Sequence, residues 1–212
     1  MEKRYLNIVH HYEKCLEKYG DSYLGVDWPN QEDAKKRYEI MMELITFRER
    51  NGSRINLLDF GCGASHLYEF ITKKNFKNIH YTGCDISNSF IELSKQKFPD
   101  NTYYCIDILG ENISLPVFDY VIMNGVFTEK NILNFEEMFD YFKRVITKVW
   151  SFTNKGLAFN VMSKQVDWER EDLFHLPLDL VSEFLCKNIT RNFIIRNDYG
   201  LYEYTVYIYK NS

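Results

Sequence analysis

Residues that break or cross-link a chain are scarce in this sequence. Its 212 residues include four prolines, ten glycines and five cysteines. So little proline and glycine leaves little room for disordered linkers. The cysteines are odd in number and show no Cys-x-x-Cys spacing, which favours free thiols over disulfides or zinc ligands. His10 and His11 lack a third ligand at a useful spacing, so we expect no metal centre and a cytoplasmic setting.

Concentrated charge of one sign and long apolar runs are also missing. The formal net charge is -4 and the isoelectric point is near 5.8, whereas phosphate binding requires a concentrated basic field. No stretch approaches the roughly 20 apolar residues that span a bilayer. The charged segment 1–11 lacks the apolar centre of a signal peptide. These absences predict that the protein binds neither nucleic acid nor a membrane.

The composition that is present can form a sizeable core, since 45% of the residues are apolar and 17% are aromatic. The first fifty residues predict two helices, at about 5–20 and 31–50, and no strand. From residue 55, short apolar runs alternate with amphipathic stretches, which is typical of parallel strands joined by right-handed crossovers. The predicted strands are 55–60, 80–85, 102–107, 120–123, 157–162, 193–196 and 202–209.

The last two predicted strands need a different connection. Only residues 197–201 separate them, too few for a parallel crossover, so they should form an antiparallel hairpin. The sequence therefore predicts an α/β fold of the Rossmann-like, doubly wound type, with seven strands in a mostly parallel sheet. Residues 1–52 are predicted to form a helical cap over the carboxyl ends of the strands, and residues 53–212 the α/β domain.

The run 57–65 predicts a strand that turns through glycines into a helix. Gly61 and Gly63 allow a tight turn and a close approach of the backbone to a ligand, and the helix start directs free N–H groups at that ligand. A dinucleotide-binding enzyme uses the same turn, but its third glycine would fall at His66, where close packing needs Gly or Ala. Asp59 would also repel a pyrophosphate. An acid at that strand end suits a ligand with an ammonium and a sulfonium group, which describes S-adenosylmethionine.

The next predicted strand ends in a second acid. Asp85 lies 22 residues after Gly63, where a carboxylate can accept hydrogen bonds from both ribose hydroxyls of a nucleoside. Ile86 follows where an apolar side chain can cover the adenine. Both positions favour a nucleoside ligand.

These positions together resemble the class I S-adenosylmethionine-dependent methyltransferases. The Asp59-x-Gly61-x-Gly63 pattern is similar to their first motif, the segment 105–108 resembles their adenine-edge site, and the segment 118–125 resembles their fourth motif. The resemblance implies S-adenosylmethionine as cofactor, with S-adenosylhomocysteine as product. The cofactor-binding residues predicted in this way are Asp59, Gly61, Gly63, His66, Asp85, Ile86, Asp107, Ile108 and Asn124. For His66, packing at the helix start is the alternative, and for Asp107 a helix or turn cap.

Three further segments, 25–29, 123–130 and 196–200, resemble a group of small bacterial methyltransferases of surface-glycan and nucleotide-sugar pathways. That resemblance implies a small-molecule acceptor, namely a hydroxyl of a sugar, a sugar phosphate or a related glycan precursor.

The acceptor is expected at the carboxyl ends of the strands, where ligands of open parallel sheets lie. Removal of a proton from a hydroxyl needs a base, and Asp167, Asp198 and His175 are the candidates. Because His175 lies in an apolar run, a packed and neutral imidazole is the alternative. Four more side chains are predicted to contact substrate: Trp28, Arg37, Trp168 and Tyr199. The tryptophans could instead be core residues, and Arg37 could instead pair with Glu32 or Asp33.

Two other functions stay open at this point. An NAD-dependent oxidoreductase has a related fold, although His66 and the terminal hairpin speak against it. A non-catalytic nucleotide-binding or adaptor protein on a methyltransferase fold is the second, because the cofactor motifs report binding and not turnover. The sequence predicts neither the acceptor's identity nor the oligomeric state.

Overall fold

The computed structural model describes residues 3–49 and 53–211. Within them, one eight-stranded sheet has the order β3-β2-β1-β4-β5-β8-β7, and the short β6 pairs with β5 outside that path. The strands are β1 (Ile55–Phe60), β2 (Ile79–Asp85), β3 (Thr102–Cys105), β4 (Phe118–Phe127), β5 (Thr153–Ser163), β6 (His175–Leu176), β7 (Phe193–Arg196) and β8 (Glu203–Tyr209).

The sheet has the mixed topology that the sequence predicts. Strands β1 to β5 pair in parallel, while β8 runs antiparallel to both β5 and β7. The antiparallel terminal hairpin is thereby confirmed. The expected number of strands is wrong, because β6 adds an eighth through the pairs Met162 with His175 and Ser163 with Leu176. Two residues are too short to show an alternating pattern in a sequence.

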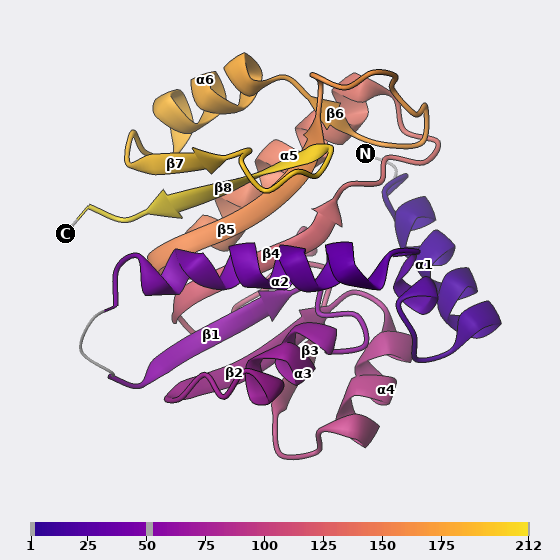
Figure 1. The fold of residues 1–212 in the computed structure, drawn as a ribbon, viewed down its shortest axis with the longest axis vertical. Helices are drawn as coiled ribbons and strands as arrows, with labels where there is room; N and C mark the ends of the chain where they lie inside the picture. Colours follow the sequence, from indigo (N-terminus) through magenta and orange to yellow (C-terminus); the bar gives the residue numbers. More distant parts are fainter. Residues whose placement is uncertain (1–2, 50–52, 212) are drawn as a thin grey trace.

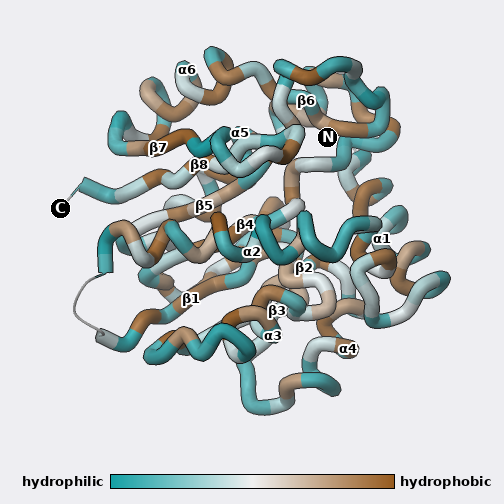
Figure 2. Tube along the Cα trace, in the orientation of Figure 1, coloured by the Kyte–Doolittle hydropathy of each residue, from teal (hydrophilic) through white to brown (hydrophobic). Residues whose placement is uncertain are grey.

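Helices cover both faces of the sheet (Figure 1). They are α1 (Leu6–Tyr19), the 3-10 helix η1 (Leu24–Val26), α2 (Gln31–Thr46), α3 (His66–Lys73), α4 (Asn88–Lys97), α5 (Phe135–Trp150) and α6 (Leu178–Asn188). The core on one face contains side chains of α2 and α3, and the core on the other contains those of α5 and α6. Hydrophobic residues gather on the strands and alternate with hydrophilic ones along the covering helices (Figure 2).

The two N-terminal helices occupy different places. Helix α1 lies beyond the carboxyl ends of the strands, as expected for a cap (Figure 1). Helix α2 instead lies on the sheet, where Met41, Met42 and Leu44 are buried in the same core as Tyr120 and Ile122. The expectation that both helices cap the edge is therefore wrong for α2, because its apolar stripe needs the sheet surface to cover it. The predicted domain boundary after residue 52 lies in segment 50–52, outside the described residues.

Local sequence determines where α2 begins, but the helix ends earlier than the sequence predicts. Asn30 is the N-cap, and its side-chain oxygen accepts hydrogen bonds from the amides of Glu32 and Asp33 at 3.0 and 3.3 Å. Such a cap contributes about 1 kcal/mol to helix stability. The helix ends at Thr46, four residues before the predicted end.

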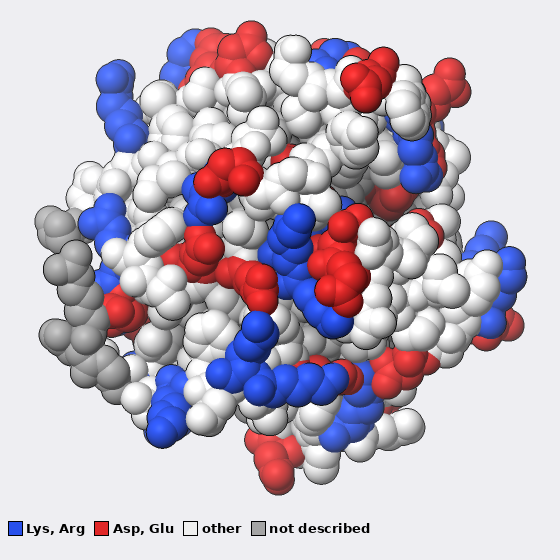
Figure 3. Space-filling model, in the orientation of Figure 1, with Lys and Arg blue, Asp and Glu red and all other residues white. Residues whose placement is uncertain are grey.

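Two surface observations complete the fold. None of the helices in the described ranges is long and apolar enough to cross a membrane. Lysines and arginines are interspersed with acidic residues on the face drawn in Figure 3. On that face, charge of one sign does not dominate.

Candidate active site

The chain order reverses between β1 and β4, and this is where an open parallel sheet leaves a crevice for ligands. From β1 the chain proceeds outward to β2 and β3, then returns to β4 on the other side of β1. The loops after β1 and β2 and the carboxyl end of β4 therefore meet at one place. A cavity lies there, and residues of α1 and η1 also line it.

The loop after β1 has a backbone that requires glycine. Gly61 and Gly63 have φ angles of 75° and 49°, in the left-handed region where side chains are strained. A Cβ added at Gly61 would lie 2.7 Å from Cγ2 of Val126, near the carboxyl end of β4. Gly61 thus lets the loop after β1 approach the end of β4 closely. Ser65 does not cap α3 with its side chain but adopts a left-handed conformation, with φ 57°.

Asp59 is a buried carboxylate at the wall of this cavity. Its exposed fraction is 3%, and one oxygen accepts a hydrogen bond from the Tyr81 hydroxyl at 2.7 Å. Burial raises the pKa of Asp59 to about 7, against the lowering effect of the Tyr81 hydrogen bond, and the nearby Asp85 carboxylate raises it further. A buried carboxylate that is ionised lowers the stability of the folded protein unless a cation lies beside it.

Asp85 organises the loops that surround it. One carboxylate oxygen accepts from the Gly63 amide and the other from the Ser87 amide, both at 2.9 Å. Burial raises the pKa of Asp85, and these backbone hydrogen bonds oppose that increase. Each oxygen still has a second lone pair for a ligand. Ser87 caps α4, as its sequence position suggests.

Asn124 has a buried side chain whose Oδ1 and Nδ2 both lack a hydrogen-bond partner in the protein, and it lines the same cavity. Unpaired buried polar atoms are rare and call for an explanation. A ligand with a donor and an acceptor at this place would satisfy them. The groups that line this cavity therefore fit S-adenosylmethionine. Its hydroxyl and ammonium groups can be bound by carboxylates, and the cavity also offers glycine amides and an amide side chain without a partner.

The cavity brings together seven of the nine predicted cofactor residues. They are Asp59, Gly61, Gly63, His66, Asp85, Ile86 and Asn124. Asp107 is not among the lining residues, because its carboxylate is held by Lys3 at 2.6 Å and the Tyr5 hydroxyl at 2.8 Å. Ile108 is buried and lines a separate surface hollow beside α5. His66 Nε2 lies 2.9 Å from Asp21, so it both borders the cavity and fixes the loop after α1.

A second cavity adjoins the first. Its walls come from the start of α2, the loop after β4 and the loop between β5 and β6. Trp28 and Tyr12 line both cavities. The second cavity contains five carboxylates, those of Asp27, Asp33, Glu129, Asp167 and Glu203, and two arginines, Arg37 and Arg170.

Both arginines of the second cavity are neutralised by the protein. Arg37 Nε lies 2.8 Å from a carboxylate oxygen of Glu203, whose side chain is 1% exposed, and Arg170 pairs with Asp172. Among the described residues, Arg37 therefore pairs with Glu203 and not with Glu32 or Asp33, the alternative that the sequence suggested. The cavity as a whole is negative.

Arg37 and Glu203 belong to a buried polar network that reaches Gly125, near the carboxyl end of β4. Asn160 donates to Glu203 at 3.0 Å and accepts from the Gly125 amide at 2.8 Å. The Tyr199 hydroxyl lies 3.0 Å from the Thr205 hydroxyl. Tyr199 is 8% exposed, belongs to the core and lines neither cavity, so the structure does not place it as a contact for substrate.

The three predicted bases have different environments. Asp167 is exposed and lines the second cavity, as does Trp168. Asp198 pairs with Arg196 at 2.7 Å, which lowers its pKa, and it lines neither cavity. His175 lines the second cavity, but Nδ1 lies 2.7 Å from the Ser163 carbonyl and Nε2 accepts from the Arg170 amide at 3.3 Å. Backbone groups thus engage both ring nitrogens of His175, as expected for a packed side chain.

Glu129 is a site residue that the sequence analysis missed. It lines the second cavity and is 8% exposed. Its backbone is fixed by a bridge to Leu173. Burial raises the pKa of Glu129 to about 7, and repulsion from Asp172 and Asp27 adds to the effect, opposed by His11 and Arg170. The only sequence signal was its position two residues after the end of β4.

Comparison with known proteins agrees with the motifs. Residues 58–148 match the model of a family described as a methyltransferase domain. A Mycobacterium tuberculosis (strain ATCC 25618 / H37Rv) protein named "Putative methyltransferase Rv1506c" is 22% identical over 159 residues, which cover 73% of this chain and 92% of that protein.

Solved structures of methyltransferases share the fold. Magnesium protoporphyrin IX methyltransferase (ChlM) from Synechocystis PCC 6803 with bound SAM has a TM-score of 0.66 at 15% identity, over 100% of this chain and 98% of that one. The plantazolicin methyltransferase BpumL in complex with SAH has a TM-score of 0.62 at 13% identity, over 100% and 91%. The names of these two proteins point to chemically different substrates, so the shared fold does not identify an acceptor.

Proposed function

We propose that this S-adenosylmethionine-dependent methyltransferase methylates a hydroxyl of a small, uncharged acceptor, a sugar or a related glycan precursor, in the second cavity. The observation that carries the proposal is the pair Trp28 and Tyr12, which line both cavities. A donor in the first cavity and an acceptor in the second would meet at these two side chains.

The donor is assigned to the first cavity by the chemistry of its walls. Asp85 would accept hydrogen bonds from the ribose hydroxyls, and Ile86 would cover the adenine. Asp59 would face the cationic part of the methionine portion, whose positive charge favours the ionised carboxylate. Asn124, with its buried unpaired amide, would orient the same portion.

The second cavity suits a neutral polyhydroxylated molecule. Carboxylates accept hydrogen bonds from hydroxyl groups, and the indole faces of Trp28 and Trp168 provide flat apolar surfaces. Arg37 and Arg170 are paired with Glu203 and Asp172. Among the described residues that line this cavity, a phosphorylated acceptor would therefore meet several carboxylates and no lysine or unpaired arginine. Among the acceptors implied by the sequence resemblance, the charge of the cavity favours the uncharged ones.

Transfer requires in-line attack on the sulfonium methyl and loss of the hydroxyl proton. The protein would supply alignment and exclusion of water. We assign the proton to Glu129, because it lines the second cavity and a carboxylate with a pKa of about 7 can accept a proton near neutral pH. Asp167, which is exposed, would orient the acceptor.

The proposal is tested with S-adenosylmethionine that carries a labelled methyl group. Three acceptor sets are compared: neutral sugars and glycosides, sugar phosphates, and nucleotide sugars. We expect label in the neutral set, in a product stable to alkali, because a methyl ether resists hydrolysis where a methyl ester does not. The Asp85→Ala variant controls for contaminating activity. Label confined to phosphorylated acceptors would refute the uncharged class, and an alkali-labile product would refute methylation of a hydroxyl.

A further inference from the structure

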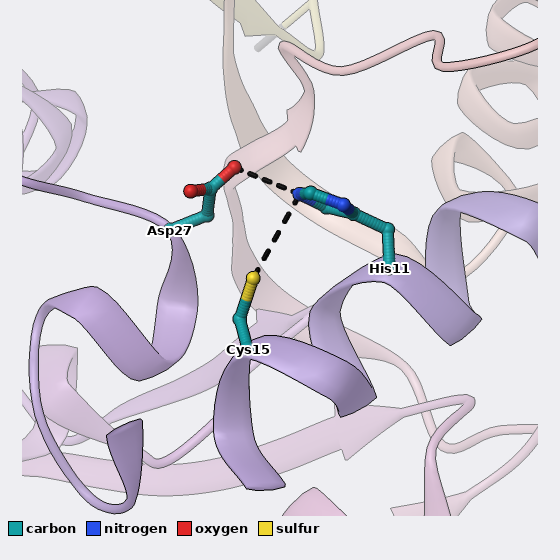
Figure 4. A group of neighbouring side chains, drawn as sticks. All are labelled: His11, Cys15 and Asp27. Atoms are coloured by element: carbon teal, nitrogen blue, oxygen red, sulfur yellow. Dashed lines mark hydrogen bonds and ion pairs between the residues drawn. The ribbon is translucent and has the colours of Figure 1, made fainter. Parts of the chain in front are cut away.

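Three potential metal ligands, His11, Cys15 and Asp27, converge on the cap (Figure 4). None of them lines the first cavity. His11 and Cys15 lie one turn apart on α1, and Asp27 follows η1. The Nε2 atom of His11 is 2.8 Å from Oδ2 of Asp27 and 3.9 Å from Sγ of Cys15. The three ligand atoms all lie within 4.8 Å of one another.

We infer that His11, Cys15 and Asp27 form a binding site for a divalent cation of the zinc type. A tetrahedral zinc ion at its usual bond lengths places nitrogen and oxygen ligands about 3.3 Å apart, and nitrogen and sulfur ligands about 3.6 Å apart. The observed separations of 2.8 and 3.9 Å differ from these by about 0.5 and about 0.3 Å, respectively. Side-chain rotation can supply these differences without a change of backbone.

Sequence reasoning excluded this site for a reason that the fold removes. No third ligand follows His10 and His11 at a regular motif spacing. However, residues four apart on a helix share a face, which brings Cys15 to His11. A reversal of the chain then brings Asp27 close to these two side chains. At this reversal Asp27 itself has a φ angle of 57°. The result is a nitrogen, sulfur and oxygen set that suits zinc.

Outside the cluster itself, no basic side chain among the described residues holds the Asp27 carboxylate. In the part of the chain that the structure describes, Asp27 forms a salt bridge with His11 and with no lysine or arginine.

A second cluster of the same kind shows the opposite situation. Asp21, His66 and Glu69 also lie within ligand distance. There, Lys97 Nζ is 2.8 Å from a carboxylate oxygen of Asp21 and 2.8 Å from one of Glu69. Because a lysine already occupies the position of the cation, we assign no metal to this cluster, and it serves as a matched control.

Solvent can reach the proposed site. The side chains of His11 and Asp27 are 34% and 37% exposed, and Asp27 also lines the second cavity. Three protein ligands leave one tetrahedral position open, and this position would lie near the rim of that cavity. A bound ion would also tie α1 to the loop after η1.

Calorimetry with zinc chloride alone tests the inference, on full-length protein stripped with a chelator and kept reduced. We expect one ion per chain. Cys15→Ser and His11→Ala should each weaken zinc binding at least roughly tenfold, since each removes a direct ligand. Cys105→Ser, which changes an exposed thiol, and His66→Ala, which alters the second cluster, should leave the affinity unchanged. Cobalt should give a thiolate-to-metal absorption band that Cys15→Ser abolishes.

Several results would overturn the site. These are no binding at one equivalent, unchanged affinity in Cys15→Ser and His11→Ala, or a loss of binding in His66→Ala. Circular dichroism of each variant shows whether it is folded. The measurement uses neither methyl donor nor acceptor, so its outcome is independent of the proposed methyl transfer.

Discussion

Trp28 packs against the Cα atom of Gly125 so closely that a Cβ added there would lie 2.8 Å from Cζ2 of the indole. Gly125 follows Asn124, which lines the donor cavity, and Trp28 lines both cavities. The guanidinium carbon of Arg37 lies 5.2 Å from the centre of the indole ring. The border between the two cavities thus depends on a contact between the cap and the carboxyl end of β4.

Replacement of Gly125 by alanine should disturb that contact. The φ angle of 79° strains alanine by about 1–2 kcal/mol, and the new methyl group would displace Trp28. We expect weaker donor binding, measured by calorimetry, and a turnover lower by roughly 10²-fold, as for ångström-scale misplacement. Gly200→Ala is the matched control, because Gly200 has a φ angle of 72° and nothing within 4 Å of an added Cβ. It should lose stability alone. Equal losses of donor affinity in both variants would contradict this account.

The ionised carboxylate of Asp59 should lower the free energy of unfolding at neutral pH and strengthen binding of the methyl donor. Its pKa is about 7 in the folded protein, against 3.8 for an ordinary aspartate, so the folded state holds the proton more tightly. The stability that this provides is present at low pH and is lost as the pH rises from about 4 to about 7. Asp59→Asn should therefore be more stable than the wild type at pH 8, by up to about 4 kcal/mol, and similar at pH 4.

The same variant should bind S-adenosylmethionine more weakly, because the ionised carboxylate is removed. Urea denaturation at the two pH values and donor titration at pH 8 measure both effects. A variant that is less stable at pH 8 would mean that Asp59 is structural.

Asp85 and Asp107 should differ in their effect on the donor. Asp85 lines the first cavity, and Asp85→Ala should weaken donor binding at least roughly tenfold, since hydrogen bonds to a charged group contribute about 1.5–3 kcal/mol each. Asp107→Ala should instead release Lys3 and Tyr5, with little change in the dissociation constant. A comparable loss of donor affinity in both variants would mean that Asp107 does contact the adenine.

Turnover should follow the protonation of Glu129. With a pKa of about 7, the carboxylate is the active form, so kcat should rise with pH through neutrality. Glu129→Gln should lower kcat by roughly 10²–10⁴-fold and abolish that rise. Asp167→Asn should mainly raise KM for the acceptor, with the pH profile retained. If Asp167→Asn abolishes the rise and Glu129→Gln does not, the two roles are reversed.

The parts of this molecule that the sequence predicts are those with local causes. Asp59, Gly61, Gly63 and Asp85 lie at strand ends where backbone geometry and ligand chemistry coincide, so a short stretch of sequence carries both. The terminal hairpin is predicted from the length of one loop. The structure adds that β8 also pairs antiparallel with β5.

The parts that escape prediction depend on distant contacts. Arg37 meets Glu203, a partner 166 residues away in sequence, so its nearest acids in the chain were misleading. Glu129 has no unusual neighbours in sequence, and its pKa is raised by burial and by Asp172 and Asp27, both distant from it in the chain. His175 lies at the predicted loop, but only the fold shows that backbone groups occupy both of its nitrogens.

The packing of α2 on the sheet has a consequence for dissection of the protein. A chain expressed from Ser53 onward would keep every cofactor motif and yet lack the helix that buries Leu57, Tyr120 and Ile122 on one face. Such a fragment would present a broad apolar surface to water and would self-associate. The smallest unit that can be crystallised, evolved or grafted onto another enzyme therefore includes α2, even though none of the donor motifs lies within it.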